Sequence, residues 1–210
     1  LASKDFLSGA SSTGTDWMAL AMGRFAPDGA DSNIPVIKDG GYQAYLDAMA
    51  AYISSTYEKN GGLLHRVKAT EWHRAAVTVA ALGGDPSAIG EYRGSSINLI
   101  ADGSYNCKVS GGPGKQGLNG WVWGLIAINV LPGDIPDDAQ YPAEDFIKEI
   151  LSRQLYENGV LAGWSLGGST DPDMTAMAIQ ALAPYYFDDT EYTYEGKNGT
   201  VTLSVRTCVE

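Results

Sequence analysis

Three tryptophans recur along the chain, each at the start of a helix-length apolar run. Trp17 and Trp72 are 55 residues apart, and Trp121 follows after a further 49. A tryptophan offers a large flat apolar face and one N–H donor, so a cavity walled by several of them suits a flat or sugar-like ligand. The same side chains could instead fill the interior, because large aromatics also dominate ordinary cores.

Charged residues stand beside the first two tryptophans. If the helices that carry them run parallel, the tryptophans and these charged groups gather at one end of the helices. The sequence therefore predicts a ligand-binding site formed by Trp17, Trp72, Trp121, Asp16, Glu71, His73 and Arg74.

The acidic residues Asp171 and Asp173, on either side of Pro172, form a second candidate. Asp171 fits the N-cap of a helix, Pro172 its first position and Asp173 its first turn, where a carboxylate satisfies free N–H groups and meets the positive end of the helix dipole. The alternative is acid catalysis, which needs a carboxyl kept protonated by burial and a neighbouring carboxylate. We favour the structural role and assign no catalytic residue.

Metal chemistry lacks its usual ligands. A zinc site needs three or four converging ligands, and the chain offers only His65 and His73, with neither Cys107 nor Cys208 near the start of an apolar helix. We expect no metal and no cofactor. The two cysteines could form one bridge, but two unrelated thiols are the simpler interpretation.

The overall charge narrows the class of partner. The 210 residues include 14 basic and 25 acidic side chains, for a net charge of −11. This balance argues against binding to nucleic acid or to an anionic membrane surface, both of which reward basic patches. The longest apolar stretch, 121–131, is interrupted by Gly124 and is too short to span a membrane.

Apolar runs with few charges predict one kind of helix. They cover 17–25, 72–82, 121–131 and 174–186. A helix without a polar face must be buried on all sides, so we expect these four to form an inner layer. Their starts recur about every fifty residues, the period of a stacked or ring-shaped helical array.

Amphipathic stretches alternate with these runs. Residues 42–57 and 143–156 place apolar side chains three or four positions apart, and 95–101 forms a weaker helix closed by Asp102-Gly103. Buried helices returned by half-exposed ones predict an all-α protein with parallel inner and antiparallel outer helices, an α/α toroid. Residues 188–205 read as a small β-hairpin turning at Asn198-Gly199, or as a long loop.

Several motifs resemble those of a known superfamily. The run 171–186 is similar to the repeat of the prenyltransferase and squalene-cyclase-like α/α toroids, and Gly163-Trp164-Ser165 resembles its Gly-x-Trp element. The strings 116–120 and 83–86 resemble the version found in secreted surface proteins of Gram-positive bacteria. The cobalamin carriers share this fold. The resemblance covers roughly residues 13–187.

The resemblance implies an extracellular or cell-surface domain that binds a small molecule, glycan or peptide, or serves surface display, without catalysis. An alternative is an enzyme like class II terpene cyclases, which carry Asp-x-Asp-Asp-Thr-Ala. Here Asp173 would be the general acid, although Met174 replaces the third acid of that motif. A weaker alternative is a carbohydrate-active α/α barrel using Glu71 with Asp173.

We expect one toroid domain over residues 1–210. Its repeats lie near 13–60, 68–105, 117–158 and 168–187. This is too few helix pairs to close a ring. We therefore expect a piece of a longer protein, truncated at the C-terminus, or a homo-oligomer in which another copy covers the open apolar edges.

Overall fold

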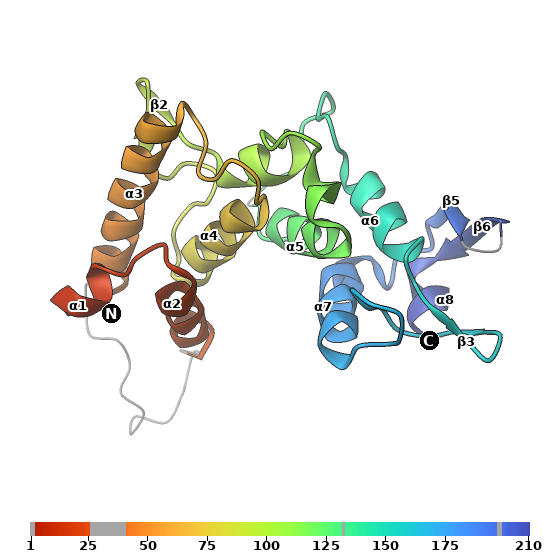
Figure 1. Ribbon diagram of the computed structural model, residues 1–210. Coiled ribbons are helices and arrows are strands. Elements are labelled where there is room, and N and C mark those ends of the chain that lie inside the picture. The colour runs from red at the N-terminus through yellow and green to blue at the C-terminus, as the bar shows by residue number, and fades with distance from the viewer. Residues whose placement is uncertain (1–2, 26–40, 132, 197–198) are drawn as a thin grey trace.

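The computed structural model describes residues 3–25, 41–131, 133–196 and 199–210. This part of the chain is mainly helical and contains three small antiparallel strand pairs (Figure 1). The prediction of a predominantly helical protein is confirmed.

Four helices pack side by side in the order of the sequence and form a continuous row. They are α2 (Thr13–Phe25), α4 (Thr70–Ala81), α5 (Leu118–Ile128) and α7 (Pro172–Leu182). The row bends into an arc, with α2 at one end and α7 at the other (Figure 1).

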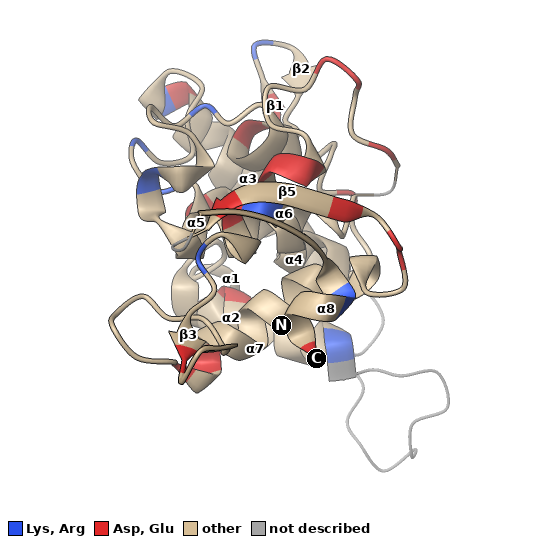
Figure 2. Cartoon of the chain, turned by 90° about the vertical axis from the view of Figure 1, so that its right-hand side faces the viewer, with Lys and Arg blue, Asp and Glu red and all other residues tan. Residues whose placement is uncertain are grey.

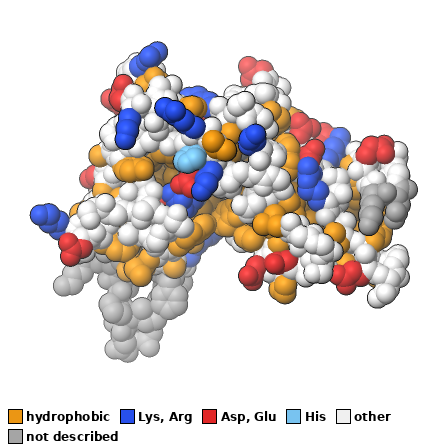
Figure 3. Space-filling view, in the orientation of Figure 1, with side chains coloured by type: hydrophobic (Ala, Val, Ile, Leu, Met, Phe, Trp, Pro, Cys, Tyr) orange, Lys and Arg blue, Asp and Glu red, His pale blue; other side chains and the backbone are white. Residues whose placement is uncertain are grey.

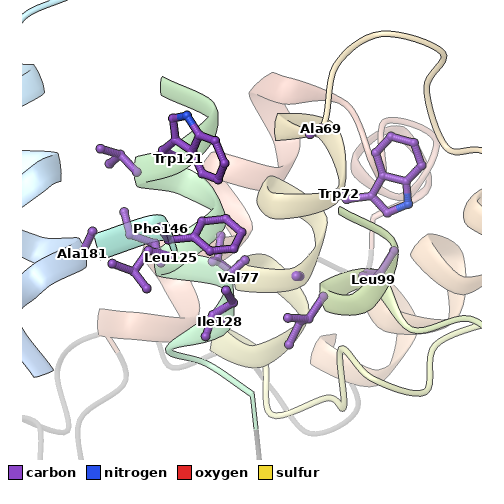
Figure 4. Packing of buried hydrophobic residues seen from close by; sticks show 14 of the residues in the cluster. Ala69, Trp72, Val77, Leu99, Trp121, Leu125, Ile128, Phe146 and Ala181 are labelled. Carbon is purple, nitrogen blue, oxygen red and sulfur yellow. The ribbon is translucent and has the colours of Figure 1, made fainter. Parts of the chain in front are cut away.

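Neighbouring helices of the row run parallel. In Figure 4, α4 descends from Ala69 to Val77 and α5 descends beside it from Trp121 to Ile128. The C-terminal ends of α5 and α7 also meet, because the Asn129 side-chain amide donates to the Ala181 carbonyl at 2.8 Å. Their N-terminal ends therefore gather along one side of the arc, as the sequence predicts.

A second set of elements packs outside the row. The long helix α3 (Gly41–Asn60) and the helix α6 (Ala143–Leu151) lie on the outer side of the arc (Figure 1). Between them, the short π-helix η1 (Ala101–Tyr105) contacts both α4 and α5. Most of the large buried side chains lie between these two layers.

Shorter elements complete the described chain. They are α1 (Lys4–Leu7), η2 (Pro113–Gln116), η3 (Ala183–Tyr185), α8 (Val205–Val209) and the strand pairs β1 (Glu91–Tyr92) with β2 (Ser95–Ser96), β3 (Tyr156–Glu157) with β4 (Val160–Leu161), and β5 (Glu191–Gly196) with β6 (Gly199–Ser204). The last pair confirms the predicted C-terminal hairpin. Its turn residue Asn198 lies outside the described residues.

The predicted outer helix at 95–101 is wrong. Ser95 and Ser96 form a strand, and the helical turns run through Asp102-Gly103 where we expected them to end. Gly103 serves close packing here, since a Cβ at this position would lie 2.4 Å from the Cβ of Trp72. A side chain there would push η1 away from α4.

The outer helix predicted for 143–156 ends five residues early, at Leu151. Residues 156–161 form the β3–β4 hairpin, and Asn158 and Gly159 occupy its turn with φ of 54° and 83°. Asn-Gly is the preferred pair for such turns because both positions need a positive φ. Asn-Gly is also a common helix-stop pair, and here it forms the turn of a hairpin instead.

The inner helices differ in how far they are buried. In α4 and α5 most side chains are buried, as predicted. In α2 and α7 they are not: Met18 and Ile179 are 56% and 43% exposed. The prediction of four helices buried on all sides is therefore wrong for the two ends of the row. Cys107 and Cys208 are both buried and free.

Candidate functional site

A hollow of about 180 Å³ lies where the N-terminal halves of α2, α4 and α5 meet. Its lining residues are Thr13 and Trp17 from α2, Thr70, Glu71 and Arg74 from α4, and Asn119 and Trp123 from α5. We call it the first hollow. Parallel packing explains it, since each helix contributes residues from its first two turns. Three of the seven predicted site residues, Trp17, Glu71 and Arg74, line it.

Two tryptophans form the aromatic wall of the first hollow. The rings of Trp17 and Trp123 lie 5.1 Å apart between centroids and are tilted by 52°. Trp17 is 36% exposed and Trp123 is half-buried. The two residues come from helices on opposite sides of α4 and meet across its N-terminal end. They present apolar ring surface to solvent beside polar groups.

Arg74 organises the polar side of this hollow. Its Nε donates to Asp16 Oδ2 at 3.0 Å, and Nη1 pairs with Glu71 Oε2 at 2.8 Å. Nη2 donates to the Ser11 carbonyl at 2.8 Å, and Nη1 also reaches the Thr13 hydroxyl at 3.3 Å. These four partners fix the position of the guanidinium and compensate its charge. Arg74 therefore forms a fixed wall of the hollow and offers no free charge to a ligand.

Asp16 is the buried anchor of the same network. Its side chain is fully buried and also accepts hydrogen bonds from the Tyr45 hydroxyl at 2.7 Å and the Ser11 N–H at 3.0 Å. Burial raises the pKa of this carboxyl, while the hydrogen bonds from Tyr45 and Arg74 and the Arg74 charge oppose that shift. Asp16 therefore ties α2 to α3 and α4, and it does not line the hollow.

The other two predicted tryptophans point into the core between the helix layers. Trp72 is fully buried, and its indole N–H donates to the Tyr57 hydroxyl of α3 at 2.6 Å. Trp121 packs edge-on against Phe146 of α6, with ring centroids 5.2 Å apart. Their rings lie well apart in Figure 4. This corrects the expected site, which grouped both with Trp17.

His73 is also buried, between α4 and η1. Its Nε2 lies 2.7 Å from the Gly103 carbonyl, so Nε2 carries the proton and donates to it. Nδ1 has no partner among the described residues. Burial lowers the pKa of His73 to about 4, which keeps the ring neutral at ordinary pH. His73 is thus a packing residue, outside the lining of the first hollow.

The acidic pair divides its roles as the structural interpretation expects. Asp171 is the N-cap of α7, with its Oδ1 accepting the Met174 N–H at 2.7 Å. Asp173 is exposed in the first turn. A catalytic acid needs burial to stay protonated, and this position does not provide it. Glu71 lines the first hollow and Asp173 a different one, so the proposed carboxylate pair shares no cavity.

Two further hollows continue along the N-terminal ends of α5 and α7. The second, of about 620 Å³, is lined by residues 116–118, 152–155 and 165–167. The third, of about 430 Å³, is lined by residues 165–174 and Met177. The space-filling view shows the surface recessed between the left-hand and right-hand parts of the molecule, with hydrophobic side chains along the recess (Figure 3).

Four lining residues of the first hollow are absent from the predicted site: Thr13, Thr70, Asn119 and Trp123. A signal for Trp123 was present. It stands two positions after Trp121 on the same helix, so the two rings face nearly opposite directions. One of them had to leave the core that the other fills. Thr70 and Asn119 carried no such signal, because single polar residues at helix starts are common.

Three further findings concern the described part of the chain. Asp and Glu are spread over many elements and do not concentrate at one site (Figure 2). No group of three or more potential metal ligands gathers within the described ranges. Every helix there is too short or too polar to cross a bilayer.

Comparison with known proteins found no match. No family model, no curated protein and no solved structure is similar to this chain.

Proposed function

We propose that this chain is part of an α/α toroid whose first hollow binds a small polar ligand with a flat apolar face. The arc of parallel helices, with a second layer outside it, supports a partial ring. The motifs that resemble secreted α/α toroids are the reason to propose an extracellular or cell-surface role. In this proposal the domain binds its ligand and does not transform it.

The partly exposed pair of Trp17 and Trp123 carries the proposal. Large aromatics are normally buried, yet these two leave apolar ring surface open beside Glu71 and Asn119. A ligand that stacks on an indole and hydrogen-bonds to a carboxylate and an amide would use every feature of the hollow. The held guanidinium of Arg74 keeps the polar wall in place before the ligand arrives, which lowers the entropic cost of binding.

Titration calorimetry with the whole chain tests the proposal. The probes are methyl glycosides of glucose, galactose, mannose and N-acetylglucosamine, together with nicotinamide and cobinamide. We expect at least one to bind, with Trp17→Ala and Trp123→Ala each lowering its affinity at least tenfold.

Tyr52→Ala is the matched control, because Tyr52 is a 47% exposed aromatic on α3, outside the first hollow. The Tyr52→Ala variant should bind the same probe with the affinity of the unaltered chain. Absence of binding by every probe would overturn the proposal, as would binding that Trp123→Ala leaves unchanged.

A further inference from the structure

We infer that the ligand is a neutral oligosaccharide that extends from the first hollow through the second and into the third. This inference rests on the proposed function and names the ligand class. The first hollow holds about 180 Å³, which is less than the roughly 300–1,000 Å³ of cavities that enclose a whole small ligand. It therefore accommodates one end of a ligand whose remainder must lie along the surface.

The three hollows adjoin one another. Thr70 lines the first and Gln116 the second, and they are joined by two hydrogen bonds: the Thr70 N–H donates to Gln116 Oε1 at 3.1 Å, and Gln116 Nε2 donates to the Thr70 hydroxyl at 3.0 Å. Leu118 and Asn119, adjacent in α5, belong to the second and first hollows respectively. Residues 165–167 line both the second and the third.

The walls of this path suit sugar rings, which have an apolar C–H face and a rim of hydroxyls. Apolar surface lies at both ends of the path, at the Trp17–Trp123 pair and at Leu166, which is 68% exposed and lines both outer hollows. Leu155 in the second hollow and Met177 in the third add further partly exposed apolar side chains. Between them the lining is rich in hydroxyl, amide and glycine backbone groups, which include Gln116, Ser152 and Ser165.

Charge favours a neutral chain over an acidic one. In the first hollow Arg74 is held between Asp16 and Glu71, and in the second Arg153 pairs with Glu149 of α6. The third hollow carries the carboxylates Asp171 and Asp173. An anionic polysaccharide would meet no uncompensated cation among these lining groups and would face two acids at its far end.

Affinity as a function of chain length tests the inference. Calorimetry on the whole chain would use gluco-, manno- and N-acetylglucosamine oligomers of one to six units, with galacturonic acid oligomers as the acidic series. We expect one neutral series to bind at least tenfold more tightly at five or six units than at one, and the acidic series to bind more weakly at each length.

Two variants locate the ends of the ligand. Trp123→Ala should weaken the monomer and the hexamer alike, whereas Leu166→Ala should lower hexamer affinity severalfold and leave the monomer unchanged. Val160→Ala is the matched control, an equally exposed aliphatic at 65% outside all three hollows. Its affinities should not change.

The outcomes separate the two proposals. If monomers bind through Trp123 but affinity does not rise with length, the oligosaccharide inference is overturned and the proposed function stands. An equal effect of Leu166→Ala on monomer and hexamer also overturns the inference. If no sugar or other probe binds through the tryptophan pair, both proposals are wrong.

Discussion

The central helices α4 and α5 and the end helices α2 and α7 share one apolar pattern and differ in burial. Val79 in α4 and Leu125 in α5 are completely buried, whereas Met18 in α2 and Ile179 in α7 are about half exposed. The central helices have row neighbours on both sides, and the end helices have one. An apolar helix is thus buried only where packed neighbours cover it.

This difference also creates the candidate site. Trp17 belongs to an end helix, so its ring remains partly exposed and reaches across α4 to Trp123. Trp72, which is also preceded by a threonine and an acidic residue, belongs to a central helix and is enclosed by α3 and η1. Two tryptophans in similar local sequences therefore take different roles in the structure.

The largest effect is expected when the loss of stability caused by Trp72→Ala is compared with the loss caused by Trp17→Ala. Trp72→Ala should lower the free energy of unfolding by about 3–5 kcal/mol, since it leaves a cavity and removes the indole N–H that donates to the Tyr57 hydroxyl. Trp17→Ala should cost less than about 1 kcal/mol, because its ring is already partly in solvent. Urea denaturation followed by circular dichroism measures both. Equal losses would contradict the contrast between centre and end.

The next prediction concerns His73, whose burial in the centre of the molecule should make the free energy of unfolding depend on pH. Its folded-state pKa of about 4 lies below the ordinary value of 6.5, so below pH 6.5 the unfolded chain binds a proton that the folded protein rejects. The contribution of neutral His73 to the free energy of unfolding is complete above pH 6.5 and is lost as the pH falls to 4. The loss amounts to roughly 3 kcal/mol.

Urea denaturation at several pH values in a His65→Gln background, where His73 is the sole histidine, measures this loss. Adding His73→Gln should flatten the acid limb of the stability curve, because the amide can still donate to the Gly103 carbonyl and does not titrate. An unchanged acid limb would show that carboxylates alone produce it.

A smaller effect separates the two acids at the start of the end helix α7. Asp171→Ala should cost about 1 kcal/mol, because it removes the side-chain acceptor of the Met174 N–H. Asp173→Asn should change stability by no more than about 0.5 kcal/mol, since this side chain is exposed. Thermal unfolding of both variants provides the measurement. The reverse order would assign the cap to Asp173.

The smallest effect is expected at Ile179, and it tests whether the outer surface of the end helix α7 is exposed to solvent. Ile179→Ser should alter the free energy of unfolding by no more than about 0.5 kcal/mol if the 43% exposed side chain faces water. A loss above about 2 kcal/mol would indicate that another surface covers it. Sedimentation velocity over a concentration range would then show whether a second copy provides that cover.

Much of the helical layout could be predicted because it depends on local pattern. The apolar runs located α4 and α5 to within a few residues, and Asp171-Pro172 marked the start of α7. The outer elements were predicted less well. Gly103 and Asn158-Gly159 are stop signals by composition, yet one permits close packing and the other forms a hairpin turn. Their meaning depends on neighbours distant in the sequence.

The candidate site was predicted only in part for the same reason. The positions of Glu71 and Arg74 near a helix start could be derived from the sequence, and both line the first hollow. The direction of each tryptophan could not, because it depends on which helix face meets the outer layer. Trp72 and Trp121 turn toward α3 and α6, and the half-buried Trp123, which was not predicted, joins Trp17 in the wall of the first hollow.

The sequence by itself determined the helical class and the approximate starts of the inner helices, since these follow from periodicity and capping along the chain. Only the tertiary structure decided which apolar side chains are buried and which wall a hollow. Burial is a property of packed neighbours, and those neighbours are brought together by contacts such as Asp16–Arg74, which join residues 58 positions apart. Trp17 and Trp72 both stand near the start of an apolar helix. Their neighbours in the fold make Trp72 a core residue and Trp17 part of a candidate binding site.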